Sequence, residues 1–210
     1  MSDIFECEIM GWPLFNSLAR DVAQKIINTK YNPDFIIGLA RGGWVLSRVL
    51  CDYLGVKDLA SLKVEHWGVT ASQDGSAQIK YPLTIDLKGR RVLIVDDITD
   101  TGDSLRLAVD HITHLSPDEL KTVTLRYIKG GKFIPDYYAD EITWRWVIFP
   151  WNYIEDMCNI VSKIAISNPL RKDIREQLKT DYHINIKLDE ISQVIDTIRR
   201  REAPDFPLKK

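Results

Sequence analysis

Two adjacent acids followed by a turn of small polar residues stand near the middle of the chain. Asp96 and Asp97 directly follow the apolar run Val92–Val95, and the polar turn Thr99–Ser104 comes after them. The apolar run predicts a strand buried on both faces, and the turn opens an amphipathic helix. Backbone N–H groups at the start of a helix bind phosphate, and neighbouring carboxylates accept hydrogen bonds from a vicinal diol. The sequence therefore predicts a phosphate cradle beside a pair of ribose acceptors.

A second set of phosphate-binding residue types, Gly38–Gly43, follows a predicted strand and opens a predicted helix. Its glycines let the backbone approach an anion, and Arg41 offers a cation to neutralise it. The competing interpretation is a dinucleotide-binding fingerprint. Ala40 occupies the place of its middle glycine, however, and no ribose-binding acid follows at the required distance. The segment is therefore interpreted as a second anion-binding loop.

The central motif, two strand-end acids followed by Thr-Asp-Thr-Gly-Asp-Ser, resembles the phosphoribosyl-pyrophosphate (PRPP) motif of type I phosphoribosyltransferases. Adjacent strand-end acids also occur in receiver domains and Walker B segments, but neither of these needs such a turn. The segment Gly38–Gly43 resembles the pyrophosphate loop of the same family, in which a basic residue precedes two glycines. The resemblance implies a cis peptide bond between Ala40 and Arg41.

The same resemblance implies a role for each motif residue. Asp96 and Asp97 would hold the ribose hydroxyls and, through water, a Mg²⁺ ion. The 5′-phosphate would be bound by Thr99, Asp100, Thr101, Gly102, Asp103 and Ser104, and the pyrophosphate by Ala40, Arg41, Gly42 and Gly43. Asp100 is the expected catalytic residue, because a carboxyl group in the turn can exchange a proton with a purine ring nitrogen.

Lys129 and the aromatic segment Trp146–Trp151 resemble the base-reading part of bacterial xanthine-guanine phosphoribosyltransferases. The resemblance implies that the purine is bound by Lys129, Trp146 and Val147. Ile148 and Asn152 stand where that family carries acids, which favours adenine or hypoxanthine over guanine and xanthine. The polar segment Thr70–Ala77 is expected to be a lid that closes over the site.

Alternating strands and helices predict an α/β fold. The expectation is a type I phosphoribosyltransferase fold, a mainly parallel twisted sheet with helices on both faces and a helical C-terminal extension. Expected strands cover 34–39, 58–65, 79–85, 91–95, 121–127 and 142–149, and expected helices begin at Pro13 and cover 44–54, 104–113, 169–180 and 188–201.

Composition shifts near Ser162, which predicts a phosphoribosyltransferase core over residues 1–162 and a helical extension of unknown role over 163–210. The extension carries eleven basic and eight acidic residues, a balance of +3. A helical extension packed on the core or on a partner subunit is favoured over a nucleic-acid-binding appendage. The run Arg199–Arg201 supports the appendage only weakly, because a charge run is usually a solvated face.

The composition excludes several classes of protein. The 210 residues are 45% hydrophobic with a formal net charge of -2, which gives no argument for nucleic acid or membrane as a partner. No apolar run approaches a membrane span, and no signal peptide is recognisable. Three widely spaced cysteines fit a reducing cytosol and no zinc site. A cytoplasmic homo-oligomer, most simply a dimer, is expected.

The predicted function is Mg²⁺-dependent purine salvage by a phosphoribosyltransferase, a glycosyltransferase of the pentosyl type. PRPP and a purine base would give a nucleoside 5′-monophosphate and pyrophosphate. One alternative is a PRPP-sensing regulator with a nucleic-acid-binding C-terminal segment. Another is a pyrimidine or orotate phosphoribosyltransferase.

Overall fold

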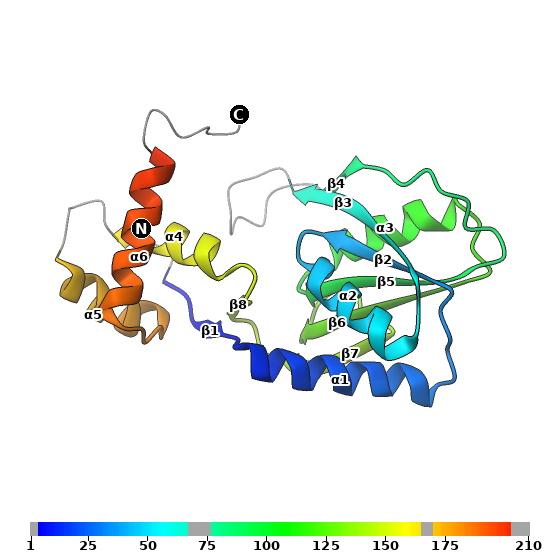
Figure 1. Cartoon of the computed structure of the whole chain (residues 1–210), viewed down its shortest axis with the longest axis horizontal. Coiled ribbons are helices and arrows are strands. Elements are labelled where there is room, and N and C mark those ends of the chain that lie inside the picture. The colour runs from blue at the N-terminus through cyan, green and yellow to red at the C-terminus, as the bar shows by residue number, and fades with distance from the viewer. Residues whose placement is uncertain (1–3, 67–76, 165–169, 203–210) are drawn as a thin grey trace. The chain divides into compact units, whose positions relative to one another are not determined.

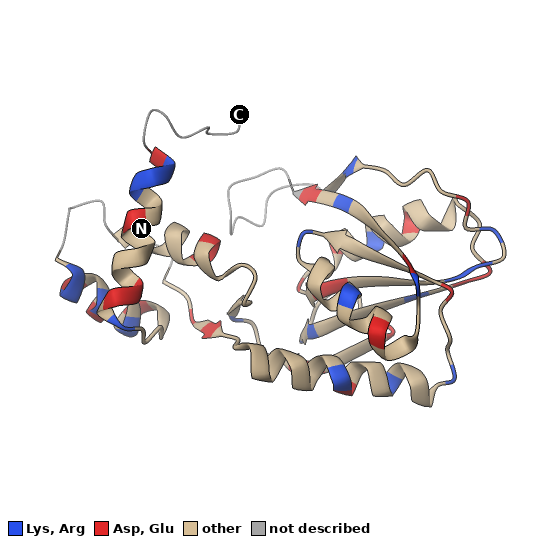
Figure 2. Cartoon of the chain, in the orientation of Figure 1, with Lys and Arg blue, Asp and Glu red and all other residues tan. Residues whose placement is uncertain are grey.

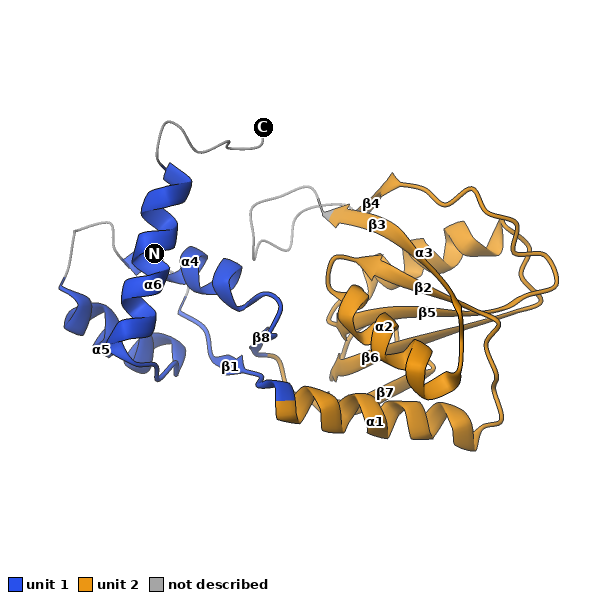
Figure 3. Ribbon diagram, viewed as in Figure 1, with its two compact units in different colours: residues 1–12, 145–210 blue, residues 13–144 orange. Residues whose placement is uncertain are grey.

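The computed structural model describes residues 4–66, 77–164 and 170–202. The chain divides into two compact units, shown in different colours in Figure 3. Unit 2 is the continuous segment Pro13–Trp144, whereas unit 1 combines Met1–Trp12 with Arg145–Lys210. The division therefore differs from the boundary predicted after residue 162, which falls inside a helix of unit 1.

Unit 2 is built on a six-stranded sheet (Figure 1). Its strands are β2 (Phe35–Ala40), β3 (Asp58–His66), β4 (Ala77–Tyr81), β5 (Arg91–Thr99), β6 (Glu119–Ile128) and β7 (Tyr137–Ile142). They lie in the order β4-β3-β2-β5-β6-β7, and all neighbours are parallel except β3 and β4. Parallel strands buried on both faces explain the continuous apolar runs of β2 and β5.

Helices cover both faces of this sheet, as the sequence predicts. The helices are α1 (Trp12–Asn28), α2 (Gly43–Leu54) and α3 (Asp103–Thr113). Gly38 of β2 faces Ser47 of α2, so α2 packs on the face to which even-numbered residues of β2 point. Ile37 and Leu39 point the other way and share a buried cluster with Leu105 of α3. The structure therefore has the predicted mainly parallel α/β architecture.

In unit 1 a two-stranded sheet links the N-terminal segment to the part of the chain after unit 2. β1 (Cys7–Ile9) pairs in parallel with β8 (Trp146–Ile148). The amide of Met10 donates to the Ile148 carbonyl at 3.0 Å, and the Arg145 guanidinium lies 3.7 Å from Glu6 and 3.8 Å from Glu8. The N-terminal segment is therefore an integral part of unit 1.

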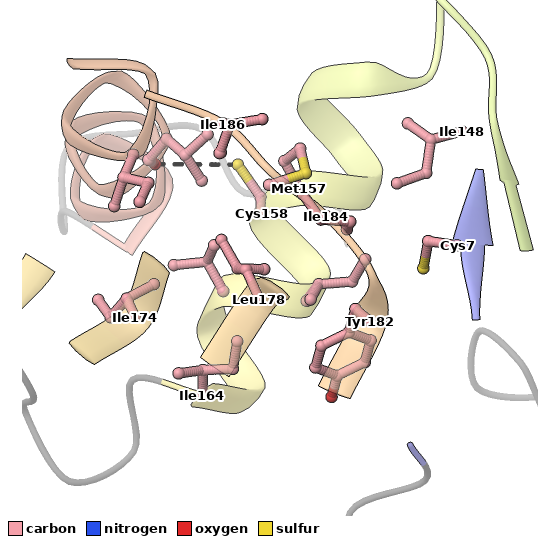
Figure 4. Packing of buried hydrophobic residues seen from close by; sticks show 14 residues of the cluster. Cys7, Ile148, Met157, Cys158, Ile164, Ile174, Leu178, Tyr182, Ile184 and Ile186 are labelled. Atoms are coloured by element: carbon pink, nitrogen blue, oxygen red, sulfur yellow. Dashed lines mark hydrogen bonds between the residues drawn. The ribbon is translucent and has the colours of Figure 1, made fainter. Parts of the chain in front are cut away.

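Three helices complete unit 1: α4 (Tyr153–Ile164), α5 (Arg171–Tyr182) and α6 (Leu188–Glu202). Their apolar faces and β1 enclose one hydrophobic core, drawn in Figure 4. Leu178 and Ile191 in this core have no exposed surface, and Ile174, Tyr182 and Val194 have almost none. The C-terminal helices are thus tightly packed against each other and against the start of the chain.

Several expected elements differ from the structure. The strand expected over 142–149 is wrong: β7 ends at Ile142 and β8 begins at Trp146, and the two lie in different sheets. The residues between the two strands, 143–145, are exposed or half-buried. The prediction treated 142–149 as one continuous apolar strand and so missed this break. The strand expected over 79–85 ends instead at Tyr81, while β1 and α4 were not predicted.

Other expectations concern membranes, cysteines and the lid. No helix of the described residues is long and apolar enough to cross a membrane. Cys7, Cys51 and Cys158 are free and buried. The sequence did not predict a disulfide framework. Residues 70–76 of the expected lid lie outside the described residues, so the lid remains a prediction.

Candidate active site

The two predicted phosphate loops meet at one edge of the sheet. Gly38 of β2 lies opposite Val95 of β5 in a parallel register, so Ala40 and Asp97, two residues further along each strand, lie at the same edge. This is the carboxyl edge of the sheet, where open α/β folds bind their ligands. The local sequences thus place the two loops side by side through the strand register alone.

A cavity of about 120 Å³ lies at the end of β5, well above the volume that one water needs. It is lined by Asp96, Ile98, Thr99, Asp100, Thr101, Gly102, Asp103, Ser104 and Leu105. All six residues predicted to bind the 5′-phosphate belong to this set. The structure therefore gathers them around one hollow.

The polar groups of the cavity are suited to an anion. Gly102 precedes α3 with φ of 85°, a conformation that favours glycine, and as the N-cap residue it has no side chain to cap the helix. The Asp103 amide makes only a long hydrogen bond, 3.4 Å, to Thr101 Oγ1. The Thr99 side chain is 2% exposed, and its Oγ1 has no hydrogen-bond partner among the described residues. A buried hydroxyl without a partner costs free energy, which a bound phosphate oxygen would relieve. Thr101 Oγ1 instead donates to Asp103 at 3.0 Å.

The second loop contacts the acid pair directly. A Cβ added to Gly42 would lie 2.5 Å from Asp97 Cγ, and one added to Gly43 would overlap the Val95 carbonyl oxygen. A side chain at position 43 would meet backbone, and one at position 42 would require Asp97 or the loop to shift. The Ala40–Arg41 peptide bond is cis, as the resemblance implied, and the Arg41 side chain is exposed.

Asp96 and Asp97 face different parts of this edge. Asp96 lines the cavity, whereas the buried Asp97 lies against the Gly42 position. The Asp97 amide donates to Asp96 Oδ1 at 3.0 Å. Burial, and then the negative charge of Asp97, raise the pKa of Asp96 well above its usual range. A cation beside the two carboxyl groups would offset the repulsion between their negative charges.

The donor set fits Mg²⁺ in the way that phosphate-handling proteins bind it. Among the described residues, no group of three or more His, Cys, Asp or Glu side chains could form a complete metal site. Mg²⁺ is commonly held by one or two carboxylates together with substrate phosphates and water. Asp96 and Asp97 supply such carboxylates, and the remaining ligands would come from the substrate.

The three predicted base-binding residues belong to different units. Lys129 directly follows β6 in unit 2; its side chain is 74% exposed, and its ammonium lies 3.9 Å from Glu141. Trp146 and Val147 lie on β8 in unit 1. The Trp146 ring is half-buried with its centroid 6.1 Å from that of Phe5, so part of its surface packs on the core of unit 1.

Sequence reasoning missed a contact between the phosphate turn and the loop after β6. A Cβ added to Gly131 would overlap the carbonyl oxygen of Asp100, and one added to Gly102 would overlap Phe133 Cβ. The loop therefore lies directly against the turn. The available signal was the glycine pair Gly130–Gly131 at the carboxyl edge of the sheet.

A mainly parallel α/β sheet with a polar cavity, an acid pair and a glycine loop at its carboxyl edge is the arrangement in which open α/β folds bind phosphorylated ligands. The family model of the phosphoribosyl transferase domain matches residues 8–156. The chain belongs to this family, and its relatives place it in the purine branch of the type I phosphoribosyltransferases.

Three relatives illustrate the similarity. A xanthine-guanine phosphoribosyltransferase of Idiomarina loihiensis is 25% identical over 154 residues, 70% of this chain and 91% of that protein. The crystal structure of a purine phosphoribosyltransferase from Pyrococcus horikoshii is 31% identical with a TM-score of 0.62, covering 70% of this chain and 94% of that one. The xanthine-guanine-hypoxanthine phosphoribosyltransferase of Helicobacter pylori, 19% identical with a TM-score of 0.63 over 75% and 99% of the two chains, shares the fold.

Proposed function

We propose that this protein transfers the phosphoribosyl group of PRPP to N9 of a purine, either adenine or a 6-oxopurine with hypoxanthine favoured. The C1–oxygen bond to pyrophosphate breaks and the C1–N9 bond forms, giving a nucleoside 5′-monophosphate and pyrophosphate. The observation that carries the proposal is the cavity at the end of β5, which includes the start of α3 and the buried hydroxyl of Thr99, without a hydrogen-bond partner among the described residues. Family membership supports the same activity.

Binding of the 5′-phosphate in this cavity would orient C1 of the sugar. Interactions with a part of the substrate that does not react can be used to position the reacting atoms. Positive charge develops on the ribose as pyrophosphate departs, and the carboxylates of Asp96 and Asp97 would stabilise it. Arg41 and the backbone amides of Gly42 and Gly43 would bind the leaving pyrophosphate.

The purine family generally uses Mg²⁺ with PRPP, and Asp96 and Asp97 are the residues that would hold the ion, partly through water. When bound, the ion supplies positive charge to the pyrophosphate and ribose oxygens. Asp100 is the proposed proton-transfer group. Its side chain is exposed at the cavity rim, within the turn that the phosphoribosyl group would occupy, and it would accept a proton from the purine as the new bond forms.

The resemblance to the purine enzymes assigns the choice of base to Lys129, Trp146 and Val147. Lys129 can only donate hydrogen bonds, so it favours a 6-oxo group over a 6-amino group. Ile148 has no exposed surface and packs in the core of unit 1, so it offers no acceptor to a 2-amino group. The first feature supports hypoxanthine over adenine, and the second supports hypoxanthine over guanine. Adenine requires Lys129 to turn away from the base.

The alternative of a PRPP-sensing regulator needs a nucleic-acid-binding surface in unit 1. Basic residues on α5 and α6 are interspersed with acids (Figure 2), and Arg199 lies 3.8 Å from Asp196. A uniformly basic face would be the usual feature of nucleic-acid binding. This distribution favours the enzyme.

The test is a substrate panel with PRPP and Mg²⁺: adenine, hypoxanthine, guanine, xanthine, orotate and uracil. Hypoxanthine should be the best substrate, and its kcat/KM should differ from that of adenine by more than tenfold, because a site that pairs with one exocyclic group leaves a buried partner unpaired with the other. A clear preference for guanine would contradict the proposed pocket. Turnover of orotate or uracil alone, or of no base, would overturn the proposed function.

A further inference from the structure

The predicted 5′-phosphate cavity lacks a basic residue of its own. Among its nine lining residues, Asp96, Asp100 and Asp103 are acids and none is Lys, Arg or His. A bound phosphate monoester would add nearly two further negative charges. The start of α3 contributes only about half a positive charge. A cation from a neighbouring segment would therefore strengthen binding considerably.

The loop after β6 brings such a cation to the turn. Gly131 packs on the Asp100 carbonyl, and Phe133 packs on Gly102, whose added Cβ would lie 3.2 Å from both Phe133 N and Cα. The Gly131 amide donates to Ile128 at 3.2 Å, and its carbonyl accepts from the Tyr127 hydroxyl at 3.4 Å. The backbone on both sides of residue 132 is thus held against the phosphate turn.

The residue between these two contacts is Lys132. Its side chain is exposed, and it makes no hydrogen bond or ion pair with the described residues. The neighbouring Lys129 and Lys121, in contrast, lie near Glu141 and Asp136. Adjacent Cα atoms are about 3.8 Å apart, and the flexible four-carbon stem of lysine carries its ammonium roughly 6 Å further. The Lys132 ammonium can therefore reach the mouth of the cavity.

We propose that Lys132 binds the 5′-phosphate and supplies the cation that the cavity lacks. The inference rests on the proposed function, since it assigns a further residue to the phosphate site of the same substrate. Lys132 would bind the 5′-phosphate, whereas Arg41 is assigned to the pyrophosphate. The two cations would then hold opposite ends of PRPP.

Direct binding of ribose 5-phosphate, measured by calorimetry on the full chain, tests this assignment without requiring catalysis. Lys132→Gln should weaken binding about ten- to a hundred-fold, the effect of losing one charge-assisted hydrogen bond, and Lys132→Arg should restore most of the affinity. Arg106→Gln tests the other exposed cation near the turn, and Lys57→Gln controls for a change of net charge. Both should bind like the parent protein.

Kinetics of the reverse reaction give a second readout. Lys132→Gln should raise the KM for the nucleoside monophosphate and leave that for pyrophosphate within about twofold, whereas Arg41→Ala should do the opposite. Unchanged ribose 5-phosphate affinity in Lys132→Gln, loss of affinity in Arg106→Gln instead, or no binding by the parent protein would each overturn the proposal. If ribose 5-phosphate binds as expected but no base is turned over, only the proposed function fails.

Discussion

Gly42→Ala is the substitution whose effect can be worked out most directly from the structure. The new Cβ would lie 2.5 Å from Asp97 Cγ and 2.6 Å from Asp97 Oδ1. Ordinary van der Waals contact begins near 3.4 Å, so the loop or the carboxylate must move by about 1 Å. Asp97 is buried, which leaves it little room to rotate without losing its position at the ribose site. Either movement changes the geometry of the site.

A displacement of about 1 Å in a positioned site can cost about a hundredfold in rate. Gly42→Ala is therefore expected to lower kcat/KM for PRPP about a hundredfold, equivalent to about 2.7 kcal/mol of lost transition-state stabilisation. The assay is steady-state transfer to the preferred purine with PRPP varied. Ribose 5-phosphate binding should change much less, because the cavity at the end of β5 does not include Gly42.

Gly55→Ala provides the matched control. Gly55 ends α2 with φ of 68°, and an added Cβ would meet nothing within 4 Å. An L-residue in this conformation costs about 1–2 kcal/mol of stability without disturbing the site, so its kcat/KM should equal that of the parent. A Gly42→Ala enzyme within about fivefold of the parent would refute the close packing of the loop on Asp97.

Three further predictions concern catalysis, pH and unit 1. Asp100→Asn should lower kcat about 10²- to 10⁴-fold while ribose 5-phosphate still binds; a kcat within a few-fold of the parent would reject its role in proton transfer. Hydrogen bonds from Arg91 lower the pKa of Asp34 to about 2, so the ion pair stabilises the fold above about pH 4 and loses its effect as the pH falls towards 2. Urea unfolding of Asp34→Asn should show a loss of about 0.5–1 kcal/mol at pH 7 that vanishes near pH 2; a constant difference would contradict this account. Leu178→Ala, in a position without exposed surface, should destabilise unit 1 by about 2–5 kcal/mol in denaturant unfolding followed by tryptophan fluorescence. Its ribose 5-phosphate affinity should stay within about threefold, and a larger loss would show that the phosphate site depends on the core of unit 1.

The parts of the fold that the sequence predicts are those specified by local pattern. β5 and the turn after it combine a continuous apolar run with residue types that only a phosphate-binding turn requires, and the predicted residues line one cavity. The α2 helix was predicted almost to the residue, because Gly55 ends it in the left-handed conformation. Such features need no knowledge of distant segments.

Features that depend on distant partners were missed. β1 has only three residues, and its partner β8 lies near residue 147, so no local periodicity reveals it. The glycine pair Gly130–Gly131 is visible in the sequence, but the contact of Gly131 with the Asp100 carbonyl joins two segments that are distant along the chain. The α4 helix is different: Met157, Ile160 and Ile164 repeat at helical spacing and are buried, and this signal was available.

The discontinuous make-up of unit 1 determines the order in which the chain can fold during synthesis. All of unit 2, Pro13–Trp144, is synthesised before the first residue of α4. Domains tend to fold as units as they emerge, so the six-stranded sheet can form before unit 1. Residues 4–11 are made before unit 2, but their partners in β8 and α4–α6 are made after it. β1 therefore stays without its strand partner until β8 has been made, and a chain truncated near residue 150 would contain every strand of the six-stranded sheet but none of the helices that form the core of unit 1.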